Sequence, residues 1–275
     1  MILKAGLSMA IEKHCFRLLD SGPQNGFLNM AVDQAIAHAV ETEKAEPTIR
    51  FYTWAVPALS IGAFQPIREV NLDRCRAMGI PVVRRITGGR ALLHEAEMTY
   101  SVACPIPSPF FPSSLQDCCH IIAEALQLGL QQIGLTAQIV PPMHRQLTKP
   151  HSPDCFSTPS LYELTVDGCK LVGSAQRRWL KVFLQHGSIP IQTDRRLEKE
   201  LMVGVIENHS QKTVRLSELL DSVPSVEKIK DALAFGFEKR LGITLKKGHL
   251  TLEENALAQE LARTRYAADA WTHRR

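Results

Sequence analysis

The sequence contains no long hydrophobic run. Across its 275 residues, no apolar stretch approaches the roughly 18 residues that a helix needs to cross a membrane. The short apolar start around Lys4 is not followed by the continuous apolar core of a signal peptide. We therefore predict a cytoplasmic protein with no part in a membrane.

Strong charge and paired cysteines are also missing. A net charge of +4 is too mild to indicate nucleic-acid binding, although it suits an acidic protein partner. The seven cysteines include no CxxC pair, and no histidines show metal-ligand spacing on one element. We therefore predict free thiols in a reducing compartment, no metal site and no nucleic-acid partner.

The remaining composition is that of an ordinary globular enzyme, with 45% hydrophobic and 22% charged residues. A chain of this length forms one large domain or two small ones, with enough residues for a full core. We expect a single domain over residues 1–275, with a mostly helical part from about residue 195.

Apolar periodicity divides the chain into helices and strands. Helical spacing and capping residues predict six helices, at residues 25–42, 72–78, 114–133, 213–220, 225–241 and from 251 onward. Runs rich in β-branched and aromatic residues predict strands at 48–54, 58–63, 80–83, 98–103 and 182–191. The first two strands are expected to pair with each other, and the last to be interrupted at 185–188.

The most distinctive stretch is residues 84–94. Gly88 and Gly89 follow a buried strand, so the backbone there can turn sharply and approach a ligand closely. Arg85, Arg90 and His94 place hydrogen-bond donors and a titratable group around this turn. An ordinary basic surface turn would carry the same residues, and two later segments of similar design favour ligand binding.

Those two later segments also combine glycine with polar side chains. Asp167-Gly168 between strand-like runs predicts a hairpin, which places Lys170 at the start of the return strand. In residues 185–188, a glycine beside His186 suggests a second close approach of backbone to a ligand.

Together these segments resemble the biotin and lipoate protein ligase and transferase catalytic-domain family. The resemblance covers most of the chain and rests on residues 29–33, 51–54, 60–62, 84–94, 167–176 and 184–188. It implies an α+β fold, in which a mixed, largely antiparallel sheet packs with helices. It also implies an acyl pocket whose substrate-binding residues are Arg85, Thr87, Gly88, Gly89, Arg90, His94, Gly173, Ser174, Ala175, His186 and Gly187.

Within this family the resemblance is closest to the octanoyltransferase branch. Cys155 precedes Lys170 by fifteen positions, as does the acyl-accepting loop cysteine of that branch. The resemblance implies that octanoyl passes from acyl carrier protein through a Cys155 thioester to a lysine of a lipoyl domain such as glycine cleavage H protein. It implies no cofactor. Because a nearby ammonium favours the thiolate, we predict that Lys170 activates Cys155.

Three alternatives stay open at this point. An ATP-dependent lipoate protein ligase would use the same loop and Lys170 to hold a lipoyl-adenylate, but its chemistry does not require Cys155. An amidotransferase that moves octanoyl between lipoyl domains would differ only in its donor. A binding protein that senses acyl or biotinyl groups would show no turnover.

Overall fold

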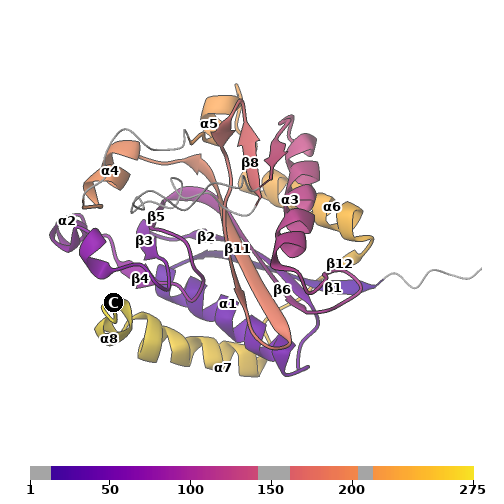
Figure 1. The fold of residues 1–275 in the computed structure, drawn as a ribbon, viewed down its shortest axis with the longest axis horizontal. Helices are drawn as coiled ribbons and strands as arrows, with labels where there is room; N and C mark the ends of the chain where they lie inside the picture. Colours follow the sequence, from indigo (N-terminus) through magenta and orange to yellow (C-terminus); the bar gives the residue numbers. More distant parts are fainter. Residues whose placement is uncertain (1–13, 142–161, 204–212) are drawn as a thin grey trace, which may run out of the picture.

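A mixed six-stranded sheet forms the centre of the computed structural model, which describes residues 14–141, 162–203 and 213–275 (Figure 1). Its order is β10-β11-β6-β2-β1-β12. The strands are β1 (Cys15–Gln24), β2 (Thr48–Trp54), β6 (Ala96–Pro105), β10 (Gly173–Arg178), β11 (Val182–Gln192) and β12 (Thr244–Lys247). Neighbours from β10 to β2 are antiparallel, whereas β1 pairs in parallel with β2 and β12. The predicted fold class is therefore confirmed.

A small sheet of order β4-β3-β5 carries the glycine loop. Its strands are β3 (Ala58–Ile61), β4 (Val82–Arg84) and β5 (Leu92–His94), so the loop joins β4 to β5. The predicted pairing of residues 48–54 with 58–63 is wrong. Both edges of β2 are occupied by β1 and β6, which leaves β3 to pair with β4 and β5 instead.

A second small sheet contains the predicted hairpin. Its strands, in the order β7-β8-β9, are β7 (Gln138–Val140), β8 (Glu163–Val166) and β9 (Cys169–Lys170). The turn between β8 and β9 places Asp167 and Gly168 at φ 50° and 73°, the left-handed region that such two-residue hairpins require. The return strand β9 is short, because the chain then leaves its pairing with β8 and enters the main sheet as β10.

Strand β11 is continuous, so the predicted interruption at 185–188 is wrong. His186 and Gly187 pair with Ser101 and Tyr100 of β6. A Cβ atom on Gly187 would lie 2.5 Å from the Tyr100 ring, which explains the glycine without a break in the strand.

Capping side chains begin the long helices where the sequence predicts them. The helices are α1 (Gly26–Glu41), α2 (Leu72–Ala77), α3 (Leu115–Gln132), α4 (Arg195–Glu200), α5 (Leu216–Leu219), α6 (Val226–Leu241), α7 (Leu252–Leu261) and α8 (Asp269–Thr272). Short helical turns also occur at Ile67–Glu69 and Ala262–Tyr266. Side chains of Asn25, Ser114 and Ser225 accept backbone N–H bonds at the starts of α1, α3 and α6. Among the described helices, none has the length and apolarity to span a bilayer.

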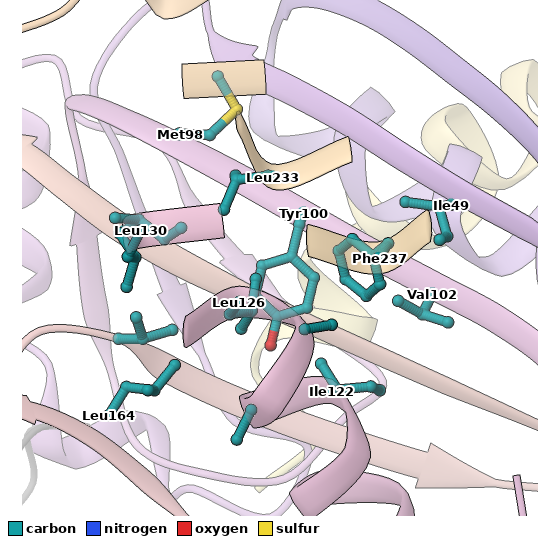
Figure 2. Close-up of a cluster of buried hydrophobic side chains, with 14 of the residues drawn as sticks. Ile49, Met98, Tyr100, Val102, Ile122, Leu126, Leu130, Leu164, Leu233 and Phe237 are labelled. Atoms are coloured by element: carbon teal, nitrogen blue, oxygen red, sulfur yellow. The ribbon is translucent and has the colours of Figure 1, made fainter. Parts of the chain in front are cut away.

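Two helical layers cover the main sheet (Figure 1). Helices α3 and α6 pack on one face, and α1 and α7 pack on the other. In the first layer, the Tyr100 ring lies among side chains of α3 and α6 such as Leu126 and Phe237 (Figure 2). The described residues after 195 are mostly helical, and the strand β12 extends the sheet beside β1.

Candidate functional site

A pocket whose volume, together with the open solvent at its mouth, is about 360 Å³ lies between the main sheet and the β4-β3-β5 sheet. Side chains and backbone from α1, both sheets and the glycine loop line it. They are Met30, Tyr52, Trp54, Ser60, Arg85, Leu92, His94, Thr99, Gly173, Ser174, Ala175, His186, Gly187 and Ser188. The pocket therefore brings together predicted substrate-binding residues from three distant segments: Arg85, His94, Gly173, Ser174, Ala175, His186 and Gly187.

The remaining predicted residues form the loop behind the pocket wall. Arg85 holds this loop, because its guanidinium donates to the carbonyls of Gly88 and Arg90 at 2.8 and 2.7 Å. Gly89 has φ 88°, and its carbonyl packs closely on Gly62. A Cβ atom on Gly62 would lie only 1.9 Å from the Gly89 carbonyl oxygen. These contacts fix the loop against β3.

His186 connects the pocket to a buried polar network on α1 and β2. Its Nδ1 lies 3.0 Å from Asp33 Oδ2, and its Nε2 lies 2.7 Å from Thr87 Oγ1. The other Asp33 oxygen accepts from Arg50 at 2.7 Å. Tyr52 donates its hydroxyl to Asp33 Oδ2 at 3.0 Å. Thr87 therefore supports the pocket through His186, without lining it itself.

Burial and neighbouring charges determine the protonation of Asp33 and His186. Burial alone would raise the pKa of Asp33, but the Arg50 guanidinium, His186 and the hydrogen bond from Ser101 together outweigh burial and lower it below the ordinary 3.8. Burial lowers the pKa of His186 below the ordinary 6.5, and the charge of Arg85 acts in the same direction. At neutral pH, a neutral His186 therefore donates from Nδ1 to an ionised Asp33.

His94 belongs to a second histidine–carboxylate pair. Its Nδ1 lies 2.8 Å from Glu97 Oε1, and its Nε2 lies 2.8 Å from Ser60 Oγ. Ser188 donates to the other Glu97 oxygen at 2.6 Å. Burial alone would raise the pKa of Glu97, but the charge of His94 and the hydrogen bonds outweigh it and lower this pKa. The Trp54 ring stacks on the imidazole at 3.8 Å and fixes its orientation.

Lys170 lies in the β8-β9 hairpin and not among the residues that line the pocket. Its Nζ donates to Glu163 Oε1 at 2.9 Å, and both side chains are buried. Cys155, the predicted nucleophile, lies outside the described residues. In the described ranges, no three His, Cys, Asp or Glu side chains are grouped so that they could share a metal ion.

Comparison with known proteins identifies the family. Residues 25–238 match the model of the lipoyl protein ligase A/B catalytic domain. The chain belongs to this family. The match includes every described residue of the pocket and confirms the resemblance that the sequence segments indicate.

Curated relatives of the lipoyl protein ligase A/B family match nearly the whole chain. Octanoyltransferase LipM of Brevibacillus brevis is 42% identical over 261 residues, which cover 90% of this chain and 95% of the relative. Proteins of the same name from Geobacillus kaustophilus and Bacillus subtilis are 37% and 36% identical over 278 residues. Both of these alignments cover 96% of this chain and 100% of the relative.

Solved structures of lipoate-protein ligases share the fold. Lipoate-protein ligase A bound with ATP superposes with a TM-score of 0.78 over 95% of this chain and 98% of the other. A bi-partite lipoate protein ligase from Thermoplasma acidophilum has the same TM-score, with 94% and 96% covered. Both are 24% identical, so the likeness concerns the fold alone.

Several pocket residues of this family member are absent from the sequence-based prediction. Asp33 and Glu97 are buried carboxylates that hold the two histidines, and Ser60 and Trp54 contact His94 directly. For Asp33, the available signal is a charged side chain among the apolar residues of the first helix. A buried carboxylate requires a partner, but the sequence does not reveal which one.

Proposed function

We propose that this protein transfers an octanoyl group to a lysine of a lipoyl domain, with octanoyl acyl carrier protein as donor. One observation carries the proposal: a pocket lined by predicted family residues occurs in a chain 36–42% identical to relatives named Octanoyltransferase LipM. Pockets for small molecules combine apolar walls with a few fixed polar groups. Met30, Trp54 and Leu92 in the wall of this pocket provide apolar contacts for an acyl chain, and Ser60, His94 and His186 provide polar groups.

The reaction proceeds in two acyl transfers. The Cys155 thiolate attacks the thioester carbonyl of the carrier, and the carrier thiol leaves. The lysine amine of the acceptor, which glycine cleavage H protein would supply, then attacks the enzyme thioester and releases the cysteine. The first transfer exchanges one thioester for another, and the second forms an amide and is downhill. No ATP is required.

The developing oxyanion needs hydrogen-bond donors. Strand β10 supplies them more readily than the glycine loop, because β10 is the last strand of the main sheet. In an antiparallel edge strand, every second residue directs its N–H away from the neighbouring strand. At least one N–H within residues 173–175 therefore faces away from β11. Lys170 supplies the positive charge that we assign to activation of Cys155.

The pocket selects the acyl chain by its apolar contacts. Each buried methylene contributes about 0.8 kcal/mol, so neighbouring chain lengths differ only modestly in affinity. We therefore expect octanoate to be preferred without rejection of slightly shorter chains.

Intact-mass spectrometry tests the proposal. The enzyme is mixed with octanoyl carrier protein without ATP, before and after addition of a lipoyl domain. We expect the enzyme to gain one octanoyl group on Cys155 and then to pass it to the acceptor. Modification only with ATP and free acid would indicate a ligase, and modification only from an octanoylated lipoyl domain would indicate an amidotransferase. Binding without any turnover would indicate an acyl-sensing protein.

A further inference from the structure

A serine and a histidine in the wall of the pocket are hydrogen-bonded in line with a buried carboxylate. We propose that Ser60, His94 and Glu97, here called the Ser60 triad, form a second nucleophilic centre that hydrolyses acyl thioesters through an acyl-serine ester. The activity differs from octanoyl transfer in nucleophile and product. It rests on the proposed function only in the choice of an eight-carbon probe.

The distances are those of a nucleophile, a base and an orienting group. Ser60 Oγ lies 2.8 Å from His94 Nε2, and His94 Nδ1 lies 2.8 Å from Glu97 Oε1. The three residues come from β3, β5 and β6, so rigid strands hold each of them. All three are buried, while Ser60 and His94 line the pocket. An acyl group in the pocket therefore lies beside the nucleophile and the base.

The neighbouring guanidinium of Arg85 directs the proton of Ser60 toward His94. Arg85 Nη1 donates to Ser60 Oγ at 2.9 Å, and a guanidinium cannot accept a hydrogen bond. The hydroxyl proton is thus available to His94 Nε2, the nitrogen that faces Ser60. Glu97 accepts hydrogen bonds from Thr99 and Ser188, and an ionised carboxylate can accept at both oxygens. The Nδ1 proton of His94 therefore points to an ionised carboxylate. This is the tautomer that a general base requires.

The imidazole is also fixed in its plane. The Trp54 ring stacks on it at 3.8 Å with an interplanar angle of 12°. Trp54 in turn donates from Nε1 to Thr99 Oγ1 at 2.9 Å. His94 is therefore held on one side by an aromatic face and at both nitrogens by hydrogen bonds.

In a second arrangement of hydroxyl, histidine and carboxylate, the histidine lines the pocket but the hydroxyl does not. Thr87 Oγ1 lies 2.7 Å from His186 Nε2, and His186 Nδ1 lies 3.0 Å from Asp33 Oδ2. Within the described residues, Thr87 is fully buried and does not line the pocket. The position of Ser60 in the pocket wall is what distinguishes the Ser60 triad as a candidate for chemistry.

The proposed hydrolysis balances with water as the second reactant. Ser60 Oγ attacks the thioester carbonyl and its proton passes to His94 Nε2, while the oxyanion forms beside the Arg85 guanidinium. The carbon–sulfur bond breaks, and the thiolate leaves as a thiol with the proton from His94. Water then attacks the serine ester and gives a proton to His94. The ester bond breaks, Ser60 recovers that proton, and the free fatty acid leaves.

Covalent labelling tests this proposal in a Cys155→Ala background, which removes the other proposed nucleophile. The probe is a fluorophosphonate with an octyl chain, and the readout is intact mass with peptide mapping. We expect one adduct on Ser60, no adduct after Ser60→Ala, and at least tenfold slower labelling after His94→Gln or Glu97→Gln. Ser101→Ala is the matched control, since Ser101 is also buried and donates to a carboxylate, Asp33, but does not line the pocket. It should leave labelling at Ser60 unchanged.

A second measurement follows thiol release from octanoyl-coenzyme A in the same background, without an acceptor protein. We expect slow release that disappears with Ser60→Ala. Labelling at another residue, labelling unaffected by His94→Gln, or equal thiol release with and without Ser60 would overturn the proposal. If Ser60→Ala does not fold, Glu97→Gln provides the test instead, because the amide keeps the shape of the carboxylate. Octanoyl transfer by the wild-type enzyme to a lipoyl domain is measured separately, so failure of either proposal is distinguishable from failure of the other.

Discussion

The ammonium of Lys170 lies 2.9 Å from Oε1 of Glu163, and both side chains are buried in the β8-β9 hairpin. The lysine that we assign to activation of Cys155 therefore also neutralises a carboxylate in the protein interior. Removal of one member of such a pair leaves the other as an uncompensated buried charge, which typically costs about 3–5 kcal/mol.

This relationship separates structural from catalytic effects of Lys170. We expect Lys170→Met to lower the unfolding free energy and to abolish octanoyl transfer. In the double variant Lys170→Met/Glu163→Gln, stability should recover in large part, because no buried charge remains, whereas transfer should stay lost. Urea unfolding and single-turnover transfer measure the two properties. Recovery of transfer in the double variant would mean that the ammonium is not needed for the reaction.

Replacement of the proposed nucleophile should affect only the chemistry. We expect Cys155→Ser to reduce octanoyl transfer by at least about 1000-fold, because a hydroxyl is a much weaker nucleophile than a thiolate at neutral pH. Thermal unfolding should remain as in the wild type. Near-normal transfer by this variant would exclude a covalent Cys155 intermediate, and the ATP-dependent reaction would be examined next.

The glycine loop offers a test with a matched control. Gly89→Val places a branched residue at φ 88° in the loop whose Gly89 carbonyl packs against Gly62, so we expect weaker acyl binding as well as backbone strain of about 1–3 kcal/mol. Gly79→Val introduces comparable strain at φ 64° with open space around its Cβ, away from the pocket. KM for the octanoyl donor should rise only for Gly89→Val. Equal effects of both variants would assign the loop a purely structural role.

The His186–Asp33 pair predicts how stability depends on pH. The pKa of His186 is lower in the folded protein than its ordinary 6.5, so below this pH the unfolded chain binds a proton that the folded protein does not. Stability should therefore be complete above pH 6.5 and fall as the pH decreases toward the folded pKa, by up to about 1.4 kcal/mol per unit. The pKa of Asp33 is lowered from 3.8, and its contribution should be lost as the pH falls below that value.

Urea unfolding at pH 7.5, 6.5 and 5.5 measures the histidine contribution. The slope between pH 6.5 and 5.5 should be smaller in His186→Asn, which cannot titrate in this range. A slope unchanged by the substitution would assign the pH dependence to other groups.

The contact between α3 and α6 should be sensitive to a single methyl group. A Cβ on Gly236 would lie 2.1 Å from the carbonyl oxygen of Ala125, which is backbone and cannot rotate away. We expect Gly236→Ala to destabilise the fold by about 1–3 kcal/mol, although alanine favours a helix by roughly 1 kcal/mol over glycine. Phe235→Ala, on the exposed side of the same helix, should change stability by less. A more stable Gly236→Ala variant would show that the two helices separate easily.

The sequence by itself determined the features that depend on neighbouring residues. Ser114 begins α3 and Thr251 begins α7, because a side-chain oxygen there accepts a backbone N–H a few residues later. Asp167 and Gly168 form the turn of a hairpin, since these residues tolerate positive φ. The family and half of the residues in the pocket wall also follow from local segments, which the fold brings together.

Only the tertiary structure decided which elements meet. Apolar periodicity shows which face of a strand is buried but not its neighbour, so β2 and β3 separate into different sheets and β12 joins β1. The partners of buried charges are likewise set by the fold: His186 finds Asp33 from 153 positions away. A buried polar group needs a hydrogen-bond partner, and the sequence indicates which polar groups are buried among apolar residues. The packing of distant elements then decides which residue becomes the partner.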